Sequence, residues 1–320
     1  MDKTILEKTG FQHLDPDQFR DEKIILRDGR KAVLWVDSDS GHGILDPEYW
    51  VENDYYEKTY REQFSANFDG KQVDPENHLA IFKDLNRKQF VQFEKHLSSK
   101  SKVLEVGCSF GGIISQVAES GVAEYHAVEP NKQDADFVEK MIPDLKLYSN
   151  SFEEADLPEE FYDLVICFEV LEHVSSPRLF LEKTSKVLKR GGLVNFEVPN
   201  HNVALLRCYQ SSGHDQFYYH KAHIHYFTSE SMNRLFQSCG FEGQASSFLV
   251  YPFFNHVFWH FNRGPQESFE AALTTPQPTS GESKVQREIN AFYSQVESQY
   301  EDLVNRHGAG DCLLYQGRKK

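Results

Sequence analysis

The sequence has 320 residues, enough for one full hydrophobic core with substantial additions, and its formal net charge is −15 at pH 7. A chain with this charge is not expected to dock electrostatically on DNA, RNA or an anionic membrane surface. No apolar run is long enough to span a membrane, and the charged residues 1–8 do not resemble a signal peptide.

Residues 1–75 are predicted to form a cap rather than an independent domain. Two apolar runs within residues 22–36 are joined through Asp28-Gly29, a pattern typical of a β-hairpin. Asp46-Pro47 is expected to open a helix dense in aromatic residues, namely Tyr49, Trp50, Tyr55, Tyr56, Tyr60 and Phe64. Aromatic residues in a helix are usually core, but tyrosine hydroxyls also suit the wall of a polar pocket. A second helix is expected over about residues 78–97.

A glycine-rich turn follows the next apolar strand. Residues 103–112 read Val-Leu-Glu-Val-Gly-Cys-Ser-Phe-Gly-Gly, residues 113–118 continue as a helix, and residues 125–129 form a second strand that ends on a carboxylate. This order of strand, glycine turn, helix and strand is typical of a nucleoside-binding βαβ unit, in which the acid accepts hydrogen bonds from ribose hydroxyls. The sequence therefore predicts a cofactor that contains a nucleoside.

The turn can be read in two ways. As the dinucleotide motif G-x-G-x-x-G it offers Gly107, Ser109 and Gly112, and as E-x-G-x-G-x-G it offers Glu105, Gly107, Ser109 and Gly111. Glu105 favours the second reading, because a carboxylate buried in an apolar strand is costly without a donor. A cofactor with an ammonium group would supply that donor, whereas a pyrophosphate would be repelled. The alternative is that Glu105 caps a nearby loop.

The second half of the chain continues the alternation of strands and helices. Residues 161–168 form an apolar strand that leads into Glu169, Glu172 and His173, and residues 177–189 form an amphipathic helix stopped by Arg190-Gly-Gly192. The later elements are expected to be strands over residues 193–198, 241–251 and 311–319, a helix over residues 229–239, and an insertion over residues 252–308. The insertion contains a helix over about residues 284–304.

At this point the chain resembles the class I S-adenosylmethionine-dependent methyltransferases. The matching segments, in family order, are residues 104–111, 127–130, 161–165, 169–173 (Glu-Val-Leu-Glu-His) and 188–192. The resemblance covers roughly residues 80–250 and implies a Rossmann-like α/β fold with a seven-stranded, mostly parallel sheet. Residues 76–251 would form the cofactor-binding core, and residues 309–320 would supply its last, antiparallel strand.

The resemblance also implies roles for individual residues. Those expected against the methionine and ribose part of the cofactor are Gly107, Cys108, Gly111, Phe168 and Glu169. Glu105 would reach the amino group, directly or through water, and Glu129 would accept from both ribose hydroxyls. Pro130 would pack on adenine. Ser151 stands where the family often has an aspartate, and the amide of Phe152 would contact the ring.

Transfer of a methyl group to a hydroxyl needs in-line approach and removal of a proton. His173 follows the fourth strand at the ligand-binding edge of the sheet and is the first candidate base; alternatively it only fixes its loop. In residues 220–227 the alternation predicts His223 and His225 on one side of an extended segment, facing the acceptor. With His214-Asp215 nearby they could hold a metal, but related methyltransferases often carry a similar histidine that closes the pocket, so no metal is predicted.

The predicted function is methylation of a hydroxyl on a small polar acceptor, a sugar or a sugar-containing metabolite being the first expectation. A phenolic or other specialised metabolite and transfer to nitrogen or carbon stay open. The rivals from other classes are a non-catalytic binding protein for the same cofactor and an NAD-dependent oxidoreductase. Five scattered cysteines without a C-x-x-C pair indicate reduced thiols in a cytoplasmic protein. The apolar stripe of the helix in the insertion predicts packing on the cap or a homodimer.

Overall fold

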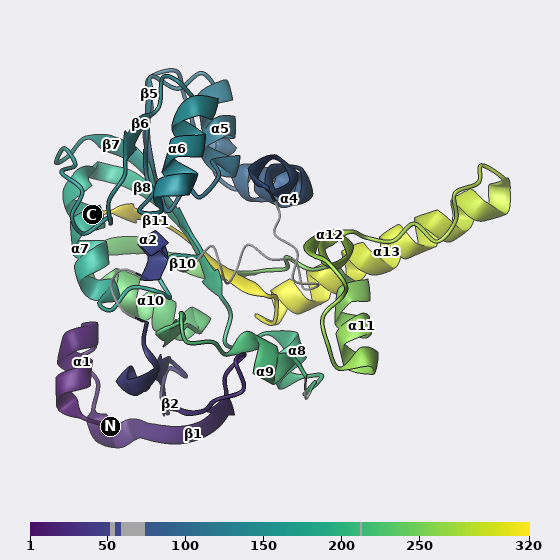
Figure 1. The fold of residues 1–320 in the computed structure, drawn as a ribbon, viewed down its shortest axis with the longest axis horizontal. Coiled ribbons are helices and arrows are strands. Elements are labelled where there is room, and N and C mark those ends of the chain that lie inside the picture. The colour runs from purple at the N-terminus through teal and green to yellow at the C-terminus, as the bar shows by residue number, and fades with distance from the viewer. Residues whose placement is uncertain (52–54, 59–73, 212) are drawn as a thin grey trace.

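The computed structural model describes residues 1–51, 55–58, 74–211 and 213–320 of the chain. Its large sheet has seven strands in the order β10-β11-β8-β7-β4-β5-β6. Their bounds are β4 Lys102–Val106, β5 Glu124–Val128, β6 Lys146–Tyr148, β7 Tyr162–Phe168, β8 Leu188–Pro199, β10 Phe241–Phe248 and β11 Cys312–Lys319. Strands β4 to β8 pair in parallel, and β11 is antiparallel to both of its neighbours. This confirms the predicted mostly parallel α/β sheet (Figure 1).

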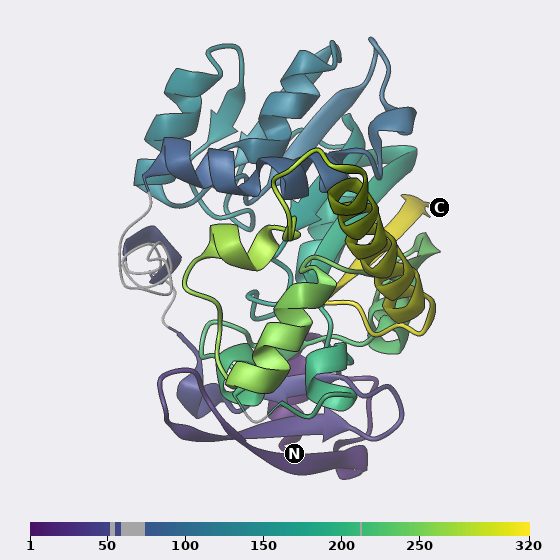
Figure 2. The same ribbon diagram turned by 90° about the vertical axis from the view of Figure 1, so that its right-hand side faces the viewer.

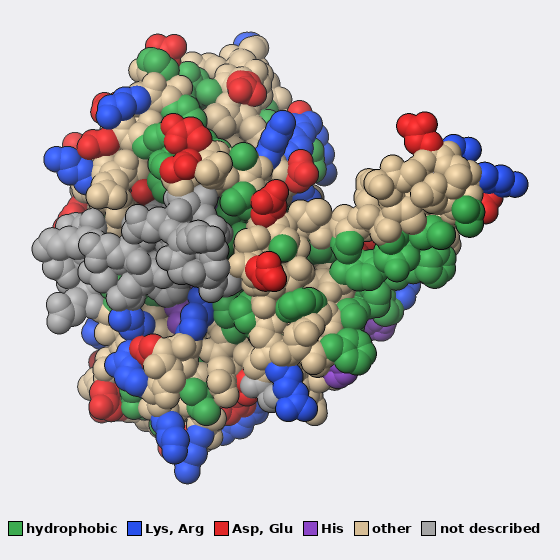
Figure 3. All heavy atoms as spheres, turned by 45° about the vertical axis from the view of Figure 1, so that its right-hand side comes forward, with side chains coloured by type: hydrophobic (Ala, Val, Ile, Leu, Met, Phe, Trp, Pro, Cys, Tyr) green, Lys and Arg blue, Asp and Glu red, His purple; other side chains and the backbone are tan. Residues whose placement is uncertain are grey.

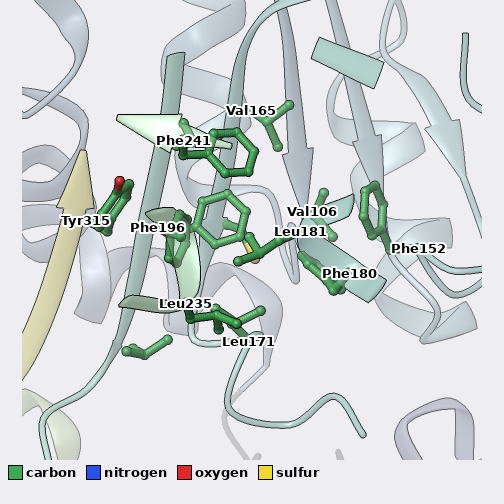
Figure 4. Packing of buried hydrophobic residues seen from close by; sticks show 14 of the residues in the cluster. Val106, Phe152, Val165, Leu171, Phe180, Leu181, Phe196, Leu235, Phe241 and Tyr315 are labelled. Atoms are coloured by element: carbon green, nitrogen blue, oxygen red, sulfur yellow. The ribbon is translucent and has the colours of Figure 1, made fainter. Parts of the chain in front are cut away.

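Helices cover both faces of the large sheet because its strands are apolar on both sides. On one face Val106 and Val165 pack with Phe180 of α7 (Pro177–Val187) and Leu235 of α10 (Ser229–Ser238), as Figure 4 shows. On the other face Val103 and its neighbours pack with α4 (Pro75–Phe90), α5 (Gly112–Glu119) and α6 (Lys132–Met141). The two cores hold the carboxyl ends of β4, β5 and β7 rigidly at one edge.

A four-stranded sheet of order β1-β2-β3-β9 lies on the side of the molecule opposite α5 and α6 (Figures 1 and 2). Its strands are β1 Phe19–Ile25, β2 Lys31–Asp37, β3 Gly43–Leu45 and β9 His225–Tyr226. Strands β1 and β2 form the predicted hairpin, with Gly29 at a φ of +85° in its turn. The fourth strand comes from the segment after β8, so this sheet is built from two distant parts of the chain.

Several predicted boundaries differ from the structure. The aromatic segment is not one helix: a short 3₁₀ turn, Pro47–Tyr49, is followed by an extended Trp50 and then by α2, Tyr55–Lys58. Tyr60 and Phe64 lie outside the described residues. Helix α4 ends at Phe90, and β8 begins at Leu188, so Arg190-Gly-Gly192 lies inside the strand. The remaining helices are α1 Lys3–Thr9, α8 Ala204–Arg207 and α9 His214–Tyr218.

The segment between β10 and β11 contains α11 (Phe253–Asn262), α12 (Phe269–Leu273) and α13 (Lys284–Arg306), and α13 projects from the body of the molecule (Figure 1). Of its apolar stripe only Val304 is buried, and hydrophobic side chains such as Phe292 are exposed along the projecting part (Figure 3). The base of α13 packs on α11 rather than on the cap, through Tyr300 and Phe253. Contact with a second subunit stays a prediction. Within the described ranges, no helix combines the length and apolar character needed to cross a membrane.

Candidate functional site

A cavity of about 1230 Å³ opens at the carboxyl edge of the large sheet, toward the four-stranded sheet. The predicted cofactor residues in its wall are Gly107, Glu129, Pro130, Ser151, Phe152, Phe168 and Glu169, and the predicted acceptor-side residues there are His173 and His223. Glu105, Cys108 and Gly111 are not among its described lining residues. Parallel strands end at the same edge of a sheet, which is why residues so far apart in sequence share one cavity.

The turn after β4 depends on glycine at two positions. Gly107 has a φ of +77°, and a Cβ atom there would lie 2.4 Å from Cγ2 of Val170. Gly111 has a φ of +82°, and its Cβ would lie 2.9 Å from Cε of Met141. Ser109, in the place of the middle glycine of the motif, also adopts a left-handed conformation with a φ of +49°. A side chain at Gly107 would therefore push this turn away from the turn that follows β7.

Glu129 is fixed by the turn that precedes α5 and by the start of α6. Its Oε2 accepts a hydrogen bond from the amide of Ser109 at 2.8 Å, and its Oε1 accepts from the amide of Asn131 at 2.9 Å. The side chain is 6% exposed and lines the cavity. A carboxylate has about four acceptor positions. The two backbone amides therefore occupy one acceptor position on each oxygen of Glu129.

Glu105 lies within β4, one residue behind Val106 and the turn. It is buried, and its Oε2 has no hydrogen-bond partner among the described residues. Burial raises its pKa well above the usual value, an effect opposed by a hydrogen bond from the amide of Ile114 and reinforced by the negative charge of Glu129. Glu105 is not among the described residues that line the cavity, and its contact with the cofactor, directly or through water, stays a prediction.

Glu169 begins the turn after β7 with a φ of +55°. Its side chain is exposed into the cavity, and the thiol of Cys312 lies 3.6 Å from its Oε1. Burial of the site as a whole raises the pKa of Glu169 to about 7. Glu197 of β8 is buried, accepts from Gln89 at 2.8 Å, and belongs to the same acidic group.

His173 is held in one orientation and one tautomer. Its Nδ1 lies 2.8 Å from the backbone carbonyl of Ala222 and 2.8 Å from the hydroxyl of Tyr56, which also reaches that carbonyl at 3.0 Å. A carbonyl only accepts, so Nδ1 carries the proton and Nε2 presents its lone pair. Burial lowers the pKa of His173 to about 4, and the ring is therefore neutral near pH 7.

Glu172 lies beside His173 and is a residue to which the sequence assigned no role. It is 1% exposed, and neither carboxylate oxygen has a hydrogen-bond partner in the described part of the chain. Its Oε1 is 3.6 Å from Nε2 of His173 and 3.8 Å from Nε2 of His223. Its backbone carbonyl accepts from the amides of Ile224 and His225, which brings the histidine segment to this turn. We call Glu172, His173 and His223 the Glu-His-His cluster.

The expected alternation of the histidine segment does not hold. His225 does not line the described cavity; its Nδ1 lies 3.1 Å from Nε2 of His42, and the two rings stack. The reason is that His223 lies in a turn, with its amide bonded to the carbonyl of His220, and the strand begins only at His225. The alternative metal set of His223 and His225 with His214-Asp215 is not assembled either, because His214 packs against Trp259.

Comparison with known proteins adds three findings. The family model described as "Methyltransferase domain" matches residues 78–246. The ubiquinone biosynthesis O-methyltransferase of Idiomarina loihiensis is 31% identical over 147 residues, 41% of this chain and 56% of that protein. That of Erwinia tasmaniensis is 35% identical over 116 residues, 32% of this chain and 43% of that protein. The chain thus spans about half the length of the curated relatives it matches.

Solved structures similar to this one include two with S-adenosylmethionine-dependent methyltransferase in their descriptions. One, from Thermotoga maritima and described as a possible histamine N-methyltransferase, has a TM-score of 0.48 and 17% identity, and covers 77% of this chain and 94% of that one. The other, from Archaeoglobus fulgidus, has a TM-score of 0.49 and 17% identity, and covers 74% of this chain and 94% of that one.

Proposed function

The chain belongs to the methyltransferase-domain family, and from this premise we propose that it transfers a methyl group from S-adenosylmethionine to a hydroxyl of a small polar acceptor. The observation that carries the proposal is that Glu129 and the histidines of the Glu-His-His cluster lie in the wall of one cavity. A nucleoside held at one end would present its sulfonium methyl toward an acceptor held at the other.

At the cofactor end, both oxygens of Glu129 would accept from the ribose hydroxyls while the two backbone amides hold the carboxylate in place. Pro130 would pack on the adenine, and Ser151 and the amide of Phe152 would bind its polar edge. The backbone of Gly107 would meet the methionine part, which also contacts Phe168 and Glu169. Cys108 and Gly111 shape the turn from behind, and Glu105 acts through water.

At the acceptor end, the hydroxyl would be presented to the Glu-His-His cluster. In-line transfer from a sulfonium depends mainly on positioning, because holding the oxygen and the methyl carbon in line removes most of the entropic cost. His173, fixed through Ala222, offers an accepting nitrogen that orients the hydroxyl. With a pKa of about 4 it is a weak base, so orientation is its main contribution. His225 has no place in this arrangement.

The walls of the cavity indicate the chemical class of the acceptor. Lys8 and Arg27 line the cavity, and the ammonium group of Lys8 lies over the ring of Trp50. Cations and hydrogen-bonding groups next to aromatic rings suit a sugar or a sugar-containing metabolite with a negative charge. The names of the ubiquinone biosynthesis O-methyltransferase relatives favour oxygen as the acceptor atom. A phenolic metabolite is the second candidate for the acceptor.

Two measurements test the proposal. S-adenosylhomocysteine should raise the unfolding temperature of the chain and NAD should not, because a ligand stabilises only the fold that binds it. Methyl transfer from labelled S-adenosylmethionine should then be found on hydroxyl acceptors in a panel of phosphorylated or nucleotide-linked sugars, phenolic acids and amines. Stabilisation by NAD alone would overturn the cofactor assignment. Cofactor binding with label transfer confined to amines would overturn the assignment of oxygen as the acceptor atom.

A further inference from the structure

The Glu-His-His cluster has the composition and geometry of a cation site, and we propose that it binds one divalent metal ion between Glu172, His173 and His223. One ligand atom from each of these residues lies within 4.8 Å of the other two. Two imidazole nitrogens and one carboxylate oxygen form a donor set that suits Zn²⁺, Mn²⁺, Fe²⁺ or Co²⁺. Ion binding stands on this geometry alone, whereas the role of the ion in catalysis rests on the proposed function.

The first step of the argument is the state of Glu172. Its side chain is almost wholly buried, and both of its oxygens lack a hydrogen-bond partner among the described residues. A buried carboxylate is normally paired or hydrogen-bonded, because an isolated buried charge is costly. No Lys or Arg of the described chain forms an ion pair with Glu172. A bound cation would satisfy both oxygens.

The second step is the orientation of His173. Nδ1–H donates to the carbonyl of Ala222, so the lone pair of Nε2 is on the side of Glu172, whose Oε1 lies 3.6 Å away. This separation is longer than a hydrogen bond, so the two atoms do not satisfy each other directly. A metal ion between them would bind both. Metal-binding histidines commonly donate their other ring N–H to a backbone carbonyl, as His173 does here.

The third step is distance and access. Bonds from such ions to nitrogen and oxygen are about 2.0–2.2 Å long, so two ligand atoms on one ion lie about 3.0–3.5 Å apart. The observed separations of 3.6 Å and 3.8 Å need only a slight contraction. His173 and His223 also line the cavity, so the remaining coordination positions face the space proposed for the acceptor. The site is closed on the protein side and open on the acceptor side.

A second group, Glu169, Glu197 and Cys312, also places three ligand atoms within 4.8 Å of one another. Here one oxygen of each carboxylate already has a partner: the thiol of Cys312 contacts Oε1 of Glu169, and Gln89 donates to Oε1 of Glu197, which leaves Oε2 of Glu197 as the only buried oxygen of the pair without a partner among the described residues. This group therefore needs a cation less than the Glu-His-His cluster does. It supplies a matched control, because Glu197 is as deeply buried as Glu172.

In the proposed reaction the ion would bind the acceptor oxygen and make its hydroxyl more acidic. The hydroxyl proton passes to solvent water, the oxygen forms a bond to the methyl carbon, and the bond from carbon to the sulfonium sulfur breaks. The sulfur leaves with the electron pair as the neutral thioether of S-adenosylhomocysteine. As a ligand of the ion, the neutral His173 would help to activate the hydroxyl without being the base itself.

The test measures the ion directly on the full-length chain. After treatment with a chelator, titration with MnCl₂, ZnCl₂ and CoCl₂ by calorimetry should show one tight equivalent, and Co²⁺ should give the visible absorption of a nitrogen- and oxygen-ligated site. Glu172→Gln should weaken binding by more than about tenfold, because loss of a ligand costs more than loss of an outer-shell partner. Glu197→Gln should bind like the parent protein.

Each other outcome counts against the inference. Absence of a tight equivalent, unchanged binding by Glu172→Gln, or loss of binding in Glu197→Gln alone would overturn it. If Glu172→Gln does not fold, as judged by circular dichroism, His223→Gln takes its place with the same expectation. Binding of S-adenosylhomocysteine to the chelated protein separates the two proposals. If S-adenosylhomocysteine binds but the titration finds no tight metal equivalent, only this inference fails. If the metal binds but S-adenosylhomocysteine does not, only the proposed function fails.

Discussion

Replacing Glu129 with glutamine is the sharpest test of the cofactor end of the cavity. The carboxylate accepts from the amides of Ser109 and Asn131, one on each oxygen. Glutamine has a single accepting oxygen, so its NH₂ group must face either one of these amides or a ribose hydroxyl that needs an acceptor. One charge-assisted hydrogen bond, worth about 1.5–3 kcal/mol, is therefore lost in the complex. This corresponds to binding of the cofactor weakened by about 10- to 150-fold.

The assay is calorimetric titration of S-adenosylhomocysteine into each variant near neutral pH, with circular dichroism to show that the variant is folded. The matched control is Glu124→Gln, which removes the same charge at the start of β5, the strand that Glu129 follows, at a half-buried site paired with Lys102 and His126. It should bind with the affinity of the parent protein. If Glu129→Gln stays within about twofold of the parent, the reasoning about ribose recognition is refuted.

Two further predictions concern stability. Gly107→Ala should lower the free energy of unfolding by about 2–4 kcal/mol, because it combines a left-handed φ with a clash on Val170. Gly121→Ala, at a φ of +75° with no atom within 4 Å, should cost only about 1 kcal/mol in urea unfolding, and equal losses would contradict the clash. Burial raises the pKa of Asp311, but bonds from His256 and two backbone amides outweigh this and hold that pKa below its usual value. The stability that Asp311 contributes is present above a pH of about 4 and is lost as the pH falls further. Asp311→Asn should be about 3 kcal/mol less stable than the parent protein at neutral pH and should lack this loss in acid. If its free energy of unfolding fell with decreasing pH as steeply as that of the parent, Asp311 would not be the group responsible.

Much of the fold follows from local sequence patterns. The apolar runs predicted for β4, β5, β7 and β11 match the strands to within one residue, because each is bounded by charged residues or glycine and is buried on both faces. The boundary between α7 and β8 is different. Leu188 and Leu193 both pair with β7, and the register shifts between them, so the segment predicted to stop the helix is an irregularity within β8. Gly191 adopts a φ of +72° there, a conformation that glycine takes without strain.

The site also has one part that can be predicted from the sequence and one part that cannot. The position of Glu129 follows from chain order, since the second strand of a βαβ unit ends beside the first turn whatever the rest of the fold does. The meeting of Glu172 with His223 does not follow, because it depends on the amides of Ile224 and His225, which bond to the carbonyl of Glu172 and bring a distant segment to this turn. The prediction from alternation that His223 and His225 share one side was wrong. A period of two applies only to extended backbone, and His223 lies in a turn before the strand.

The pairing of β9 with β3 has a consequence for how such enzymes diversify. The four-stranded sheet is built from two chain segments: Tyr226 pairs with Gly43, and the hydroxyl of Thr228 donates to the carbonyl of Ser40. A chimera that imports a foreign amino-terminal region without residues 200–228 leaves an unmatched sheet edge over the active site. Recombination between homologues can therefore exchange substrate preference only when both chain segments come from the same parent. Point substitutions within either segment do not have this restriction.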